Sequence, residues 1–127
     1  DICGSRILLV EDNELNREIA EELLSMKGVL VESAANGEEA LKMYNTSPEY
    51  YYTAILMDIQ MPVMNGYEAT KHIRQLKRED VKSIPIIALT ANVFFDDIIQ
   101  AQRAGMNDHI AKPIDIDNLT SILEKYI

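Results

Sequence analysis

Short apolar runs alternate along the chain with longer stretches in which apolar residues recur every three or four positions. The short runs, rich in Ile, Leu and Val, predict β-strands over residues 6–10, 29–33, 53–57, 85–89 and 108–111. The longer stretches predict α-helices over residues 14–27, 37–47, 66–78, 93–104 and 115–127. Helical spacing is regular in the first of them, at Leu15, Ile19, Leu23 and Met26.

The alternation of strands and helices predicts one α/β domain over residues 1–127. Strand–helix–strand units of this length form right-handed crossovers, which build a parallel sheet with helices on both faces. The first, third and fourth strands are almost continuously apolar, as buried parallel strands are. A chain of 127 residues is long enough for one core, and no repeat or linker interrupts it.

Composition and charge narrow the classes of partner. Apolar residues make up 47% and charged residues 26% of the chain, which is typical of a folded globular domain. The net charge of −9 argues against binding to nucleic acid or to an anionic membrane surface, since both need clustered Lys and Arg. No apolar run approaches the roughly 20 residues of a membrane span.

The first residues and the cysteine content suggest a cytoplasmic location. The start of the chain lacks the basic region of a secretory signal, and Cys3, the single cysteine, has no partner for an internal disulfide. The chain does not begin with Met, so we expect it to be a piece of a longer protein.

Polar residues with chemical potential follow four of the five predicted strands. They are Glu11, Asp12, Asp58, Thr90 and Lys112. Each has an ordinary role when taken alone, because the acids and the threonine can cap helices or turns and the lysine can lie on the surface. Ligands of open α/β sheets bind beyond the carboxyl ends of the strands, so their shared position predicts a common site.

These residue types favour phosphoryl chemistry supported by magnesium. Three neighbouring carboxylates repel one another unless a cation joins them, and Mg²⁺ prefers carboxylate and phosphate oxygens. Cys3 and the two histidines have no zinc-site spacing. With Mg²⁺ present, Asp58 can act as a nucleophile on a phosphoryl group, while Lys112 neutralises the transferred oxygens and Thr90 donates a hydrogen bond.

Four segments of the chain resemble the receiver domains of two-component response regulators. In order they are ILLVEDNELN, LMDIQMPVMNG, PIIALTAN and AGMNDHIAKPI, and the likeness runs from Arg6 to Ile127. The sequence around Asp58 and Lys112 is most similar to that of receivers attached to hybrid sensor histidine kinases. The resemblance implies a (βα)5 flavodoxin-like three-layer sandwich, with a parallel five-stranded sheet in the order 2-1-3-4-5.

The resemblance also implies specific roles at the site. Asp58 would accept a phosphoryl group from a histidine of a histidine kinase or a histidine phosphotransfer domain. The metal position implied for Mg²⁺ is made by Glu11, Asp12, Asp58 and the backbone carbonyl of Gln60. Thr90 matches the switch hydroxyl, Lys112 matches the lysine that contacts the phosphate, and Pro113 matches a proline that often follows a cis peptide bond.

His109 departs from the family pattern. Receivers usually carry Tyr or Phe three residues before the lysine, where the ring moves inward as the switch hydroxyl engages the phosphoryl group. Histidine is smaller and titrates near pH 6.5, which predicts a weaker or pH-sensitive switch. A half-exposed histidine bonded to the backbone is the alternative.

Two surfaces are candidates for partner contacts. The resemblance places phosphodonor docking on the first helix, where Asn16 lies near the active rim. The fourth helix, with the fifth strand and fifth helix, is the usual output surface, so Phe95 and Ile99 are candidates for contact with a kinase domain, a phosphotransfer domain or a second copy in a homodimer. Packing of both residues against the sheet is the alternative.

The interpretation that fits best is a phosphoacceptor signalling switch rather than an enzyme with an external substrate. An aspartate-nucleophile phosphatase commonly has a second acid two residues after the nucleophile, and that position is Gln60. A flavin-binding domain would have a phosphate loop where Glu11 and Asp12 stand. An unphosphorylated interaction module would not need the full set of site residues.

Overall fold

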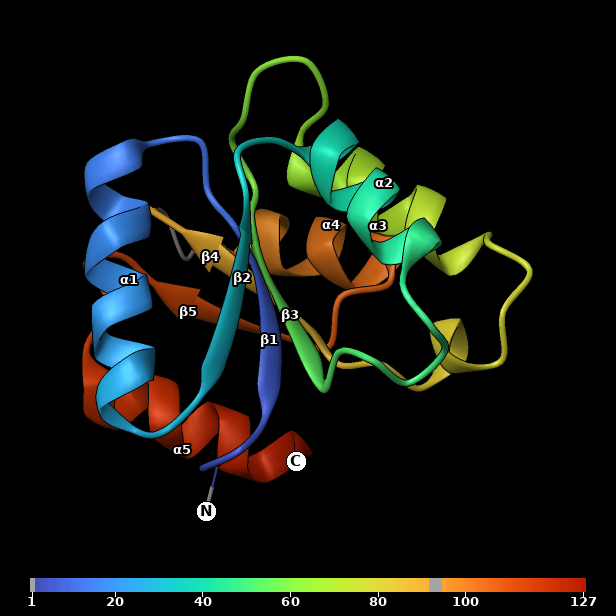
Figure 1. Cartoon of the computed structure of the whole chain (residues 1–127). Helices are drawn as coiled ribbons and strands as arrows, with labels where there is room; N and C mark the ends of the chain where they lie inside the picture. The colour runs from blue at the N-terminus through green and yellow to red at the C-terminus, as the bar shows by residue number, and fades with distance from the viewer. Residues whose placement is uncertain (1, 92–94) are drawn as a thin grey trace.

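Five parallel strands form one sheet in the order β2-β1-β3-β4-β5 (Figure 1). They are β1 (Arg6–Val10), β2 (Leu30–Ala34), β3 (Ala54–Asp58), β4 (Ile86–Thr90) and β5 (Asp108–Ala111). The computed structural model describes residues 2–91 and 95–127, except for the side chain of Phe95. This strand order is the one that the resemblance implied, so the predicted flavodoxin-like fold is confirmed.

Helices cover both faces of the sheet and make a three-layer structure. They are α1 (Glu14–Met26), α2 (Gly37–Thr46), α3 (Gly66–Arg74), α4 (Phe95–Ala104) and α5 (Ile116–Tyr126), with a short 3₁₀ turn, η1 (Asp80–Lys82). Figure 1 shows α1 and α5 on one face and α2, α3 and α4 on the other. Within residues 2–91 and 95–127, no helix has the length and apolar character needed to cross a membrane.

The central strands are apolar along their length because they feed two cores. In β1, Ile7 and Leu9 join the core under α1 and α5, whereas Leu8 and Val10 join the core under α2 and α3. All four side chains are fully buried. This two-sided burial is the reason that a continuous apolar run predicted these strands correctly.

The first helix forms where its spacing predicted it, but a different stripe faces the core. Ala20 and Leu24 are buried against the sheet, while Leu15 is 64% and Met26 is 74% exposed. Helical spacing shows that residues share a side of the helix, but it does not show which side is buried. The regular apolar pattern of α1 therefore lies mainly on the surface.

The third helix ends at Arg74, four residues earlier than predicted. Arg74 donates hydrogen bonds to the carbonyls of Gly105 and Val81, and Arg78 donates to the carbonyls of Ser47 and Pro48. The chain leaves the helix between these two arginines and then forms η1. Their contacts are to backbone groups distant in sequence, which helical periodicity does not register.

Candidate functional site

The predicted residues meet at the carboxyl edge of the sheet, around one cavity of about 210 Å³. The predicted members of its lining are Glu11, Asp12, Asp58, Gln60, Thr90 and Lys112. Asp58 and Thr90 end the neighbouring strands β3 and β4, and Glu11 follows β1 directly. Parallel strands bring these positions together because their carboxyl ends point the same way.

Neither Asp12 nor Asp58 serves as a helix cap. The N-cap of α1 is Asn13, whose side chain accepts from the backbone N–H of Asn16 at 2.9 Å. The N-cap of α3 is Asn65, which forms a capping box with Glu68. The ordinary structural role considered for both acids is thus filled by asparagines.

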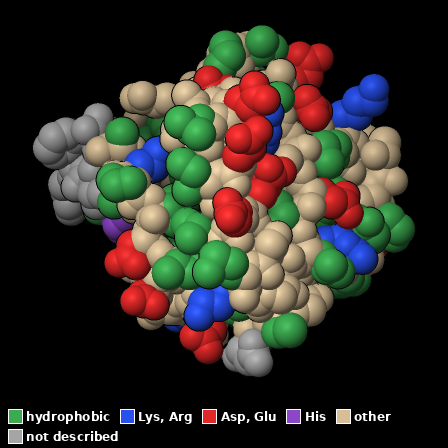
Figure 2. Space-filling model, turned by 60° about the vertical axis from the view of Figure 1, so that its left-hand side comes forward, with side chains coloured by type: hydrophobic (Ala, Val, Ile, Leu, Met, Phe, Trp, Pro, Cys, Tyr) green, Lys and Arg blue, Asp and Glu red, His purple; other side chains and the backbone are tan. Residues whose placement is uncertain are grey.

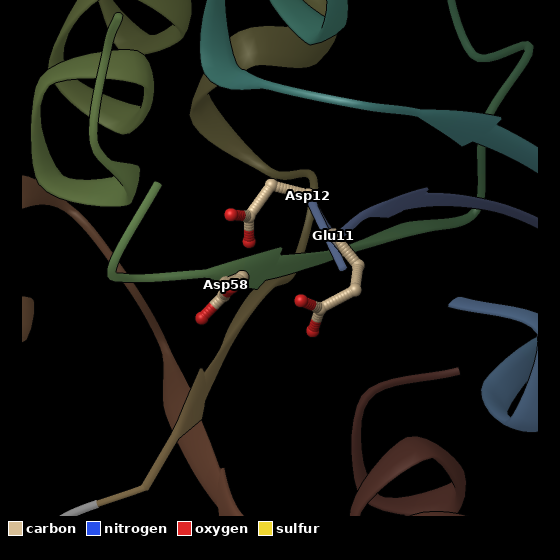
Figure 3. A group of neighbouring side chains, drawn as sticks. All are labelled: Glu11, Asp12 and Asp58. Carbon is tan, nitrogen blue, oxygen red and sulfur yellow. The ribbon is translucent and has the colours of Figure 1, made fainter. Parts of the chain in front are cut away.

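Three carboxylates form a tight group at the ends of β1 and β3 (Figure 3). Glu11, Asp12 and Asp58 each offer an oxygen, and these three atoms lie within 4.8 Å of one another. Glu11 is 2% and Asp58 is 4% exposed, whereas Asp12 is open to solvent. Two of the three charges are therefore withdrawn from water, which makes the group receptive to a cation.

Lys112 lies against two of these acids. Its Nζ atom is 2.8 Å from Glu11 Oε2 and 3.1 Å from Asp58 Oδ1. Burial alone would lower the pKa of Lys112, but the bonds to Glu11 and Asp58 outweigh that effect and raise the pKa above its ordinary value. The ammonium group is therefore a permanent positive charge beside Asp58.

Asp58 has an unusual affinity for protons. Burial and the nearby Glu11 carboxylate raise the pKa of Asp58 to about 7, although Lys112 acts in the opposite direction. A carboxyl group in this state is partly protonated at neutral pH. A cation at the three carboxylates would favour the ionised form of Asp58, which is the form that can act as a nucleophile.

Two residues that support Glu11 were not recognised as site residues from the sequence. The backbone N–H of Asn13 donates to Glu11 Oε1 at 3.2 Å, and Arg17 Nη1 donates to the Glu11 carbonyl at 3.0 Å. Asn13 contacts Glu11 through its backbone N–H, a group that does not depend on residue type. Arg17 lies on the helix after the strand, and no sequence signal distinguishes it from a surface arginine.

Gly66 fixes the loop that follows Asp58. Its backbone N–H donates to the carbonyl of Ile59 at 2.8 Å, so the first residue of α3 lies directly against the end of β3. A Cβ atom at this position would collide with the backbone of Asp58 and Ile59. The glycine in the quoted segment LMDIQMPVMNG is therefore needed for close backbone approach.

The donor set fits Mg²⁺. The groups are hard carboxylate oxygens on a partly open cavity, and Asp12 remains accessible from solvent. Such sites suit an ion that keeps several waters and binds one or two carboxylates. Lys112 contacts both buried acids, Glu11 and Asp58, whereas Asp12 is the member of the group that lies open to solvent.

The remaining predicted residues lie around this site at different distances. Asn16 lines the site cavity, and the Lys112–Pro113 peptide bond is cis, as the resemblance implied. His109 lines a separate cavity of about 250 Å³ beside α4 and α5. Ile99 is half-buried, and the side chain of Phe95, also predicted to contact partners, lies outside the described residues.

Known proteins resemble this chain over nearly its whole length. The response regulator receiver domain family matches residues 7–124. Hybrid signal transduction histidine kinase L of Dictyostelium discoideum is 38% identical over 122 residues, which are 95% of this chain and 7% of the kinase. Transcription factor SKN7 of Saccharomyces cerevisiae is 37% identical over 98% of this chain and 19% of its own length.

Solved structures extend the comparison to the site. The receiver domain of sensor histidine kinase PA1611 from Pseudomonas aeruginosa, with magnesium in its active-site cleft, has a TM-score of 0.86 and 41% identity, covering 98% of each chain. The receiver domain of Ssk1, bound to the Saccharomyces cerevisiae histidine phosphotransfer protein Ypd1, has a TM-score of 0.84 and 28% identity, covering 96% of this chain and 88% of that one. This chain belongs to the response regulator receiver domain family of two-component systems.

Proposed function

We propose that this domain is a phosphoacceptor switch and that Asp58 receives the phosphoryl group. One observation carries the proposal: the Asp58 carboxylate lies 3.1 Å from the Lys112 ammonium and beside the carboxylates of Glu11 and Asp12. A nucleophile, a fixed positive charge and a cation site thus share one cavity of about 210 Å³. That volume leaves room for a phosphoryl group.

The phosphoryl transfer uses two side chains of this domain, Asp58 as the nucleophile and Lys112 as the stabilising charge. An Asp58 oxygen forms a bond to the phosphorus of a partner's phosphohistidine, the P–N bond breaks, and the imidazole leaves with the electron pair. Lys112 stabilises the negative oxygens of the transferred group from its position at Asp58. Gln60 lies at the cavity without an acidic group, which agrees with an acceptor that is not built for rapid hydrolysis.

Magnesium belongs to this proposal. Asp12, Asp58 and the backbone carbonyl of Gln60 would hold the ion, with Glu11 supporting it from its bond to Lys112. When bound, Mg²⁺ supplies charge neutralisation for the phosphoryl oxygens and favours ionised Asp58. The related PA1611 receiver carries magnesium in its active-site cleft, which supports the assignment.

Thr90 and His109 are proposed as the switch. Thr90 ends β4 at the site cavity, and His109 lies beside β4 in the sheet, in register with Ala88. The titratable groups around the His109 ring are Asp108, whose Oδ1 is 3.8 Å from Nδ1, and Lys125 and Tyr126 of α5; the α4 residues at its cavity are uncharged. Protonated His109 would be drawn to Asp108, which favours one ring position.

A pH comparison tests this part of the proposal. The shift that phosphorylation produces in the backbone spectrum near His109 should differ between pH 5.5 and pH 8 in the wild type. The difference between the two pH values should become smaller in His109→Tyr, which keeps a ring but not the imidazole, and the part that remains is due to Asp58. Equal shifts at both pH values in the wild type would remove the pH-sensitive switch and leave Asp58 chemistry intact.

The partners follow from the same chemistry. We propose a histidine kinase or histidine phosphotransfer domain as donor, approaching Asn16 and the exposed Leu15 and Ile19 of α1. The face made by α4, β5 and α5, which includes Ile99 and Phe95, is proposed as the output surface and the contact for a homodimer. With a net charge of −9, we propose neither nucleic acid nor membrane contact by this domain, and a cytoplasmic location.

Intact-mass measurement after incubation with a small phosphodonor tests the function. With Mg²⁺, the wild type should gain one phosphate, Asp58→Asn should gain none, and Asp117→Asn, a control on the surface of α5, should behave as the wild type. Multiple rapid turnover would instead identify a phosphatase. No adduct with or without Mg²⁺ would identify an interaction module that is not phosphorylated.

A further inference from the structure

Arg17 of α1 reaches back to the turn that carries two of the three carboxylates. Its Nη1 atom donates to the carbonyl of Glu11 at 3.0 Å, and its backbone N–H donates to the carbonyl of Asn13 at 2.9 Å. Both acceptors lie in the connection between β1 and α1, which also contains Asp12. Arg17 is half-buried, so it belongs to this turn rather than to the solvated face of the helix.

The hydrogen bond from Arg17 to Glu11 fixes one peptide plane. Glu11 is 2% exposed, so its carbonyl is withdrawn from water and needs a partner within the protein. Arg17 supplies that partner. The carbonyl of Glu11 and the backbone N–H of Asp12 belong to the same rigid peptide group, which ends at the Cα atom of Asp12. The direction in which the Asp12 side chain leaves the backbone thus depends on the bond from Arg17.

Other contacts of the turn hold Glu11 but not Asp12. The backbone N–H of Glu11 donates to the carbonyl of Ala34 at 3.1 Å, and the Lys112 ammonium lies 2.8 Å from its carboxylate. Among the residues that the structure describes, none forms a hydrogen bond or ion pair with the Asp12 carboxylate. Figure 3 shows this carboxylate beside those of Glu11 and Asp58, with one oxygen of each within 4.8 Å of the others. Its place in the group is therefore set through its backbone.

Arg17 could affect a bound cation in two ways, and the two effects have opposite signs. A positive charge near a cation site repels the ion, so removal of Arg17 would tighten binding if charge alone mattered. The surroundings are already negative, because Glu14, Glu18 and Glu22 of α1 are exposed and Arg17 is the one basic residue of that helix. Figure 2, which brings this side of the molecule forward, shows acidic side chains gathered in a line. Loss of position would instead weaken binding, so the sign of the change identifies the role of Arg17.

We propose that Arg17 is a positioning residue for the cation site. Its bond to the Glu11 carbonyl orients the peptide group that carries Asp12, and this orientation strengthens the binding of Mg²⁺ by the three carboxylates. Arg17 is not among the described residues that line the site cavity, so it acts through Asp12 and not on the ion or the phosphoryl group. The inference rests on the proposed function, because that function brings Mg²⁺ to this site.

Calorimetric titration of the wild type and two variants with Mg²⁺ tests the proposal. The dissociation constant should rise about tenfold in Arg17→Met, which keeps an unbranched side chain but removes the donor and the charge. It should rise only about threefold in Arg17→Lys, because an ammonium can make part of the same bond. An unchanged or tighter dissociation constant in Arg17→Met would overturn the proposal, since Arg17 would then have no effect beyond its charge.

Arg103→Met is the control for the loss of one positive charge. Arg103 lies exposed in the last turn of α4, and its replacement changes the net charge by the same amount as Arg17→Met. The Mg²⁺ dissociation constant of this control should match that of the wild type. A weakening equal to that in Arg17→Met would show that the effect is not specific to the turn after β1 and would overturn the assignment.

Amide NMR without Mg²⁺ gives a second readout. The backbone N–H signal of Asp12 should move in Arg17→Met, whereas those of the buried Ala88 and Ile110 in β4 and β5 should stay, which shows that the variant is folded. A stationary Asp12 signal would overturn the proposal. If Arg17→Met does not fold, Arg17→Lys decides the question: its charge equals that of the wild type, so an equal Mg²⁺ dissociation constant would overturn the role of the guanidinium.

Phosphorylation by a small phosphodonor keeps the two proposals distinguishable. The wild type should gain one phosphate, and the rate of labelling should reach half its maximum at a higher Mg²⁺ concentration in Arg17→Met than in the wild type. A wild type that binds no Mg²⁺ or gains no phosphate would contradict the proposed function. Normal binding and labelling of the wild type, with the same Mg²⁺ requirement in Arg17→Met, would contradict only the role of Arg17.

Discussion

At the residue scale, Val63 occupies a backbone conformation that β-branched residues rarely adopt. Its φ angle is +71°, in the loop between Asp58 and α3, and its side chain is 75% exposed. Because this side chain is exposed, its burial contributes little free energy that would offset the backbone strain. The loop beside the acceptor therefore carries strain that is local to one residue.

Replacement of Val63 by Asn should stabilise the domain by about 1 kcal/mol, because Asn tolerates the left-handed region. Urea unfolding measures the change. Val63→Thr is the matched control, since Thr keeps the β-branch and should leave the stability near that of the wild type. A Val63→Asn variant no more stable than Val63→Thr would show that the strain is absent in solution.

The raised pKa of Asp58 predicts a pH-dependent stability. Its value of about 7 in the folded protein exceeds the ordinary 3.8, so the folded state holds more protons than the unfolded chain between these values. Stability is therefore lost as pH rises through this window. Without Mg²⁺, Asp58→Asn should be about 2 kcal/mol more stable than the wild type at pH 8, with less than half of that gain at pH 5.

Urea unfolding at both pH values, in the presence of a chelator, measures this gain. Asp117→Asn controls for the removal of a surface charge and should give no comparable pH dependence. If the gain for Asp58→Asn were the same at pH 5 and pH 8, the fold would not raise the pKa of the Asp58 carboxyl.

Residue types at strand ends were sufficient to predict most of the site. Glu11, Asp58 and Thr90 follow predicted strands that are almost continuously apolar, and parallel topology brings such positions together. Arg17 escaped prediction because its partner is a backbone carbonyl, which every residue has. When a side chain bonds to a backbone carbonyl, the sequence shows no matching partner residue, so the contact cannot be predicted from residue types.

At the element scale, the apolar periodicity of α1 predicted the bounds of the helix but not its buried face. The helix was predicted within one residue, yet its core face is Ala20 and Leu24 rather than Leu15 and Met26. Two apolar stripes satisfy helical spacing here, and spacing alone does not show which of them is buried. Close packing of α1 against the sheet selects the stripe with the smaller alanine.

The turn after α3 is held by a buried ion pair. Arg78 Nε lies 3.0 Å from Asp80 Oδ1, and Arg78 Nη2 lies 3.0 Å from Asp80 Oδ2, while the backbone N–H of Tyr50 donates to Oδ2 at 2.9 Å. Burial raises the pKa of Asp80, but these hydrogen bonds outweigh it and hold the pKa below the ordinary value. The pair joins the loop before β3 to the loop before β4.

Removal of the Asp80 charge should destabilise the domain by about 3 kcal/mol at pH 7, because it leaves Arg78 without its carboxylate partner. The contribution is present above about pH 4 and is lost as pH falls through the lowered pKa of Asp80, so the difference between Asp80→Asn and the wild type should close in acid. Thermal unfolding measures both effects. Glu79→Gln, exposed and adjacent, should change stability by less than about 0.5 kcal/mol, and an equal loss there would contradict the assignment.

At the scale of the whole molecule, the strand order that defines the fold also assembles the candidate site. The order β2-β1-β3-β4-β5 places the ends of β1, β3 and β4 side by side, and the same edge receives Lys112 after β5. The alternation of strands and helices was enough to predict a parallel sheet with two helical layers, and the resemblance added the strand order. The early end of α3 depended on contacts between distant loops and was beyond a local reading of the sequence.

The proposed binding of Mg²⁺ at the folded carboxylate group should stabilise the whole domain, because the unfolded chain does not offer that group. At 100 times its dissociation constant, the ion should add about 2.7 kcal/mol to the free energy of unfolding. Asp12→Asn should lose most of this gain, and Asp117→Asn should keep it. An undiminished Mg²⁺ effect in Asp12→Asn would place the cation elsewhere.

The site of phosphorylation is the central claim, and chemical mapping tests it most directly. The domain is phosphorylated with Mg²⁺ and a small phosphodonor, the acyl phosphate is reduced with borohydride, and the peptides are sequenced by mass spectrometry. Reduction converts a phosphorylated aspartate to homoserine, so homoserine should be found at position 58 and at no other acid. Homoserine at position 12, or phosphate retained on a serine, threonine or histidine with position 58 unchanged, would contradict the account.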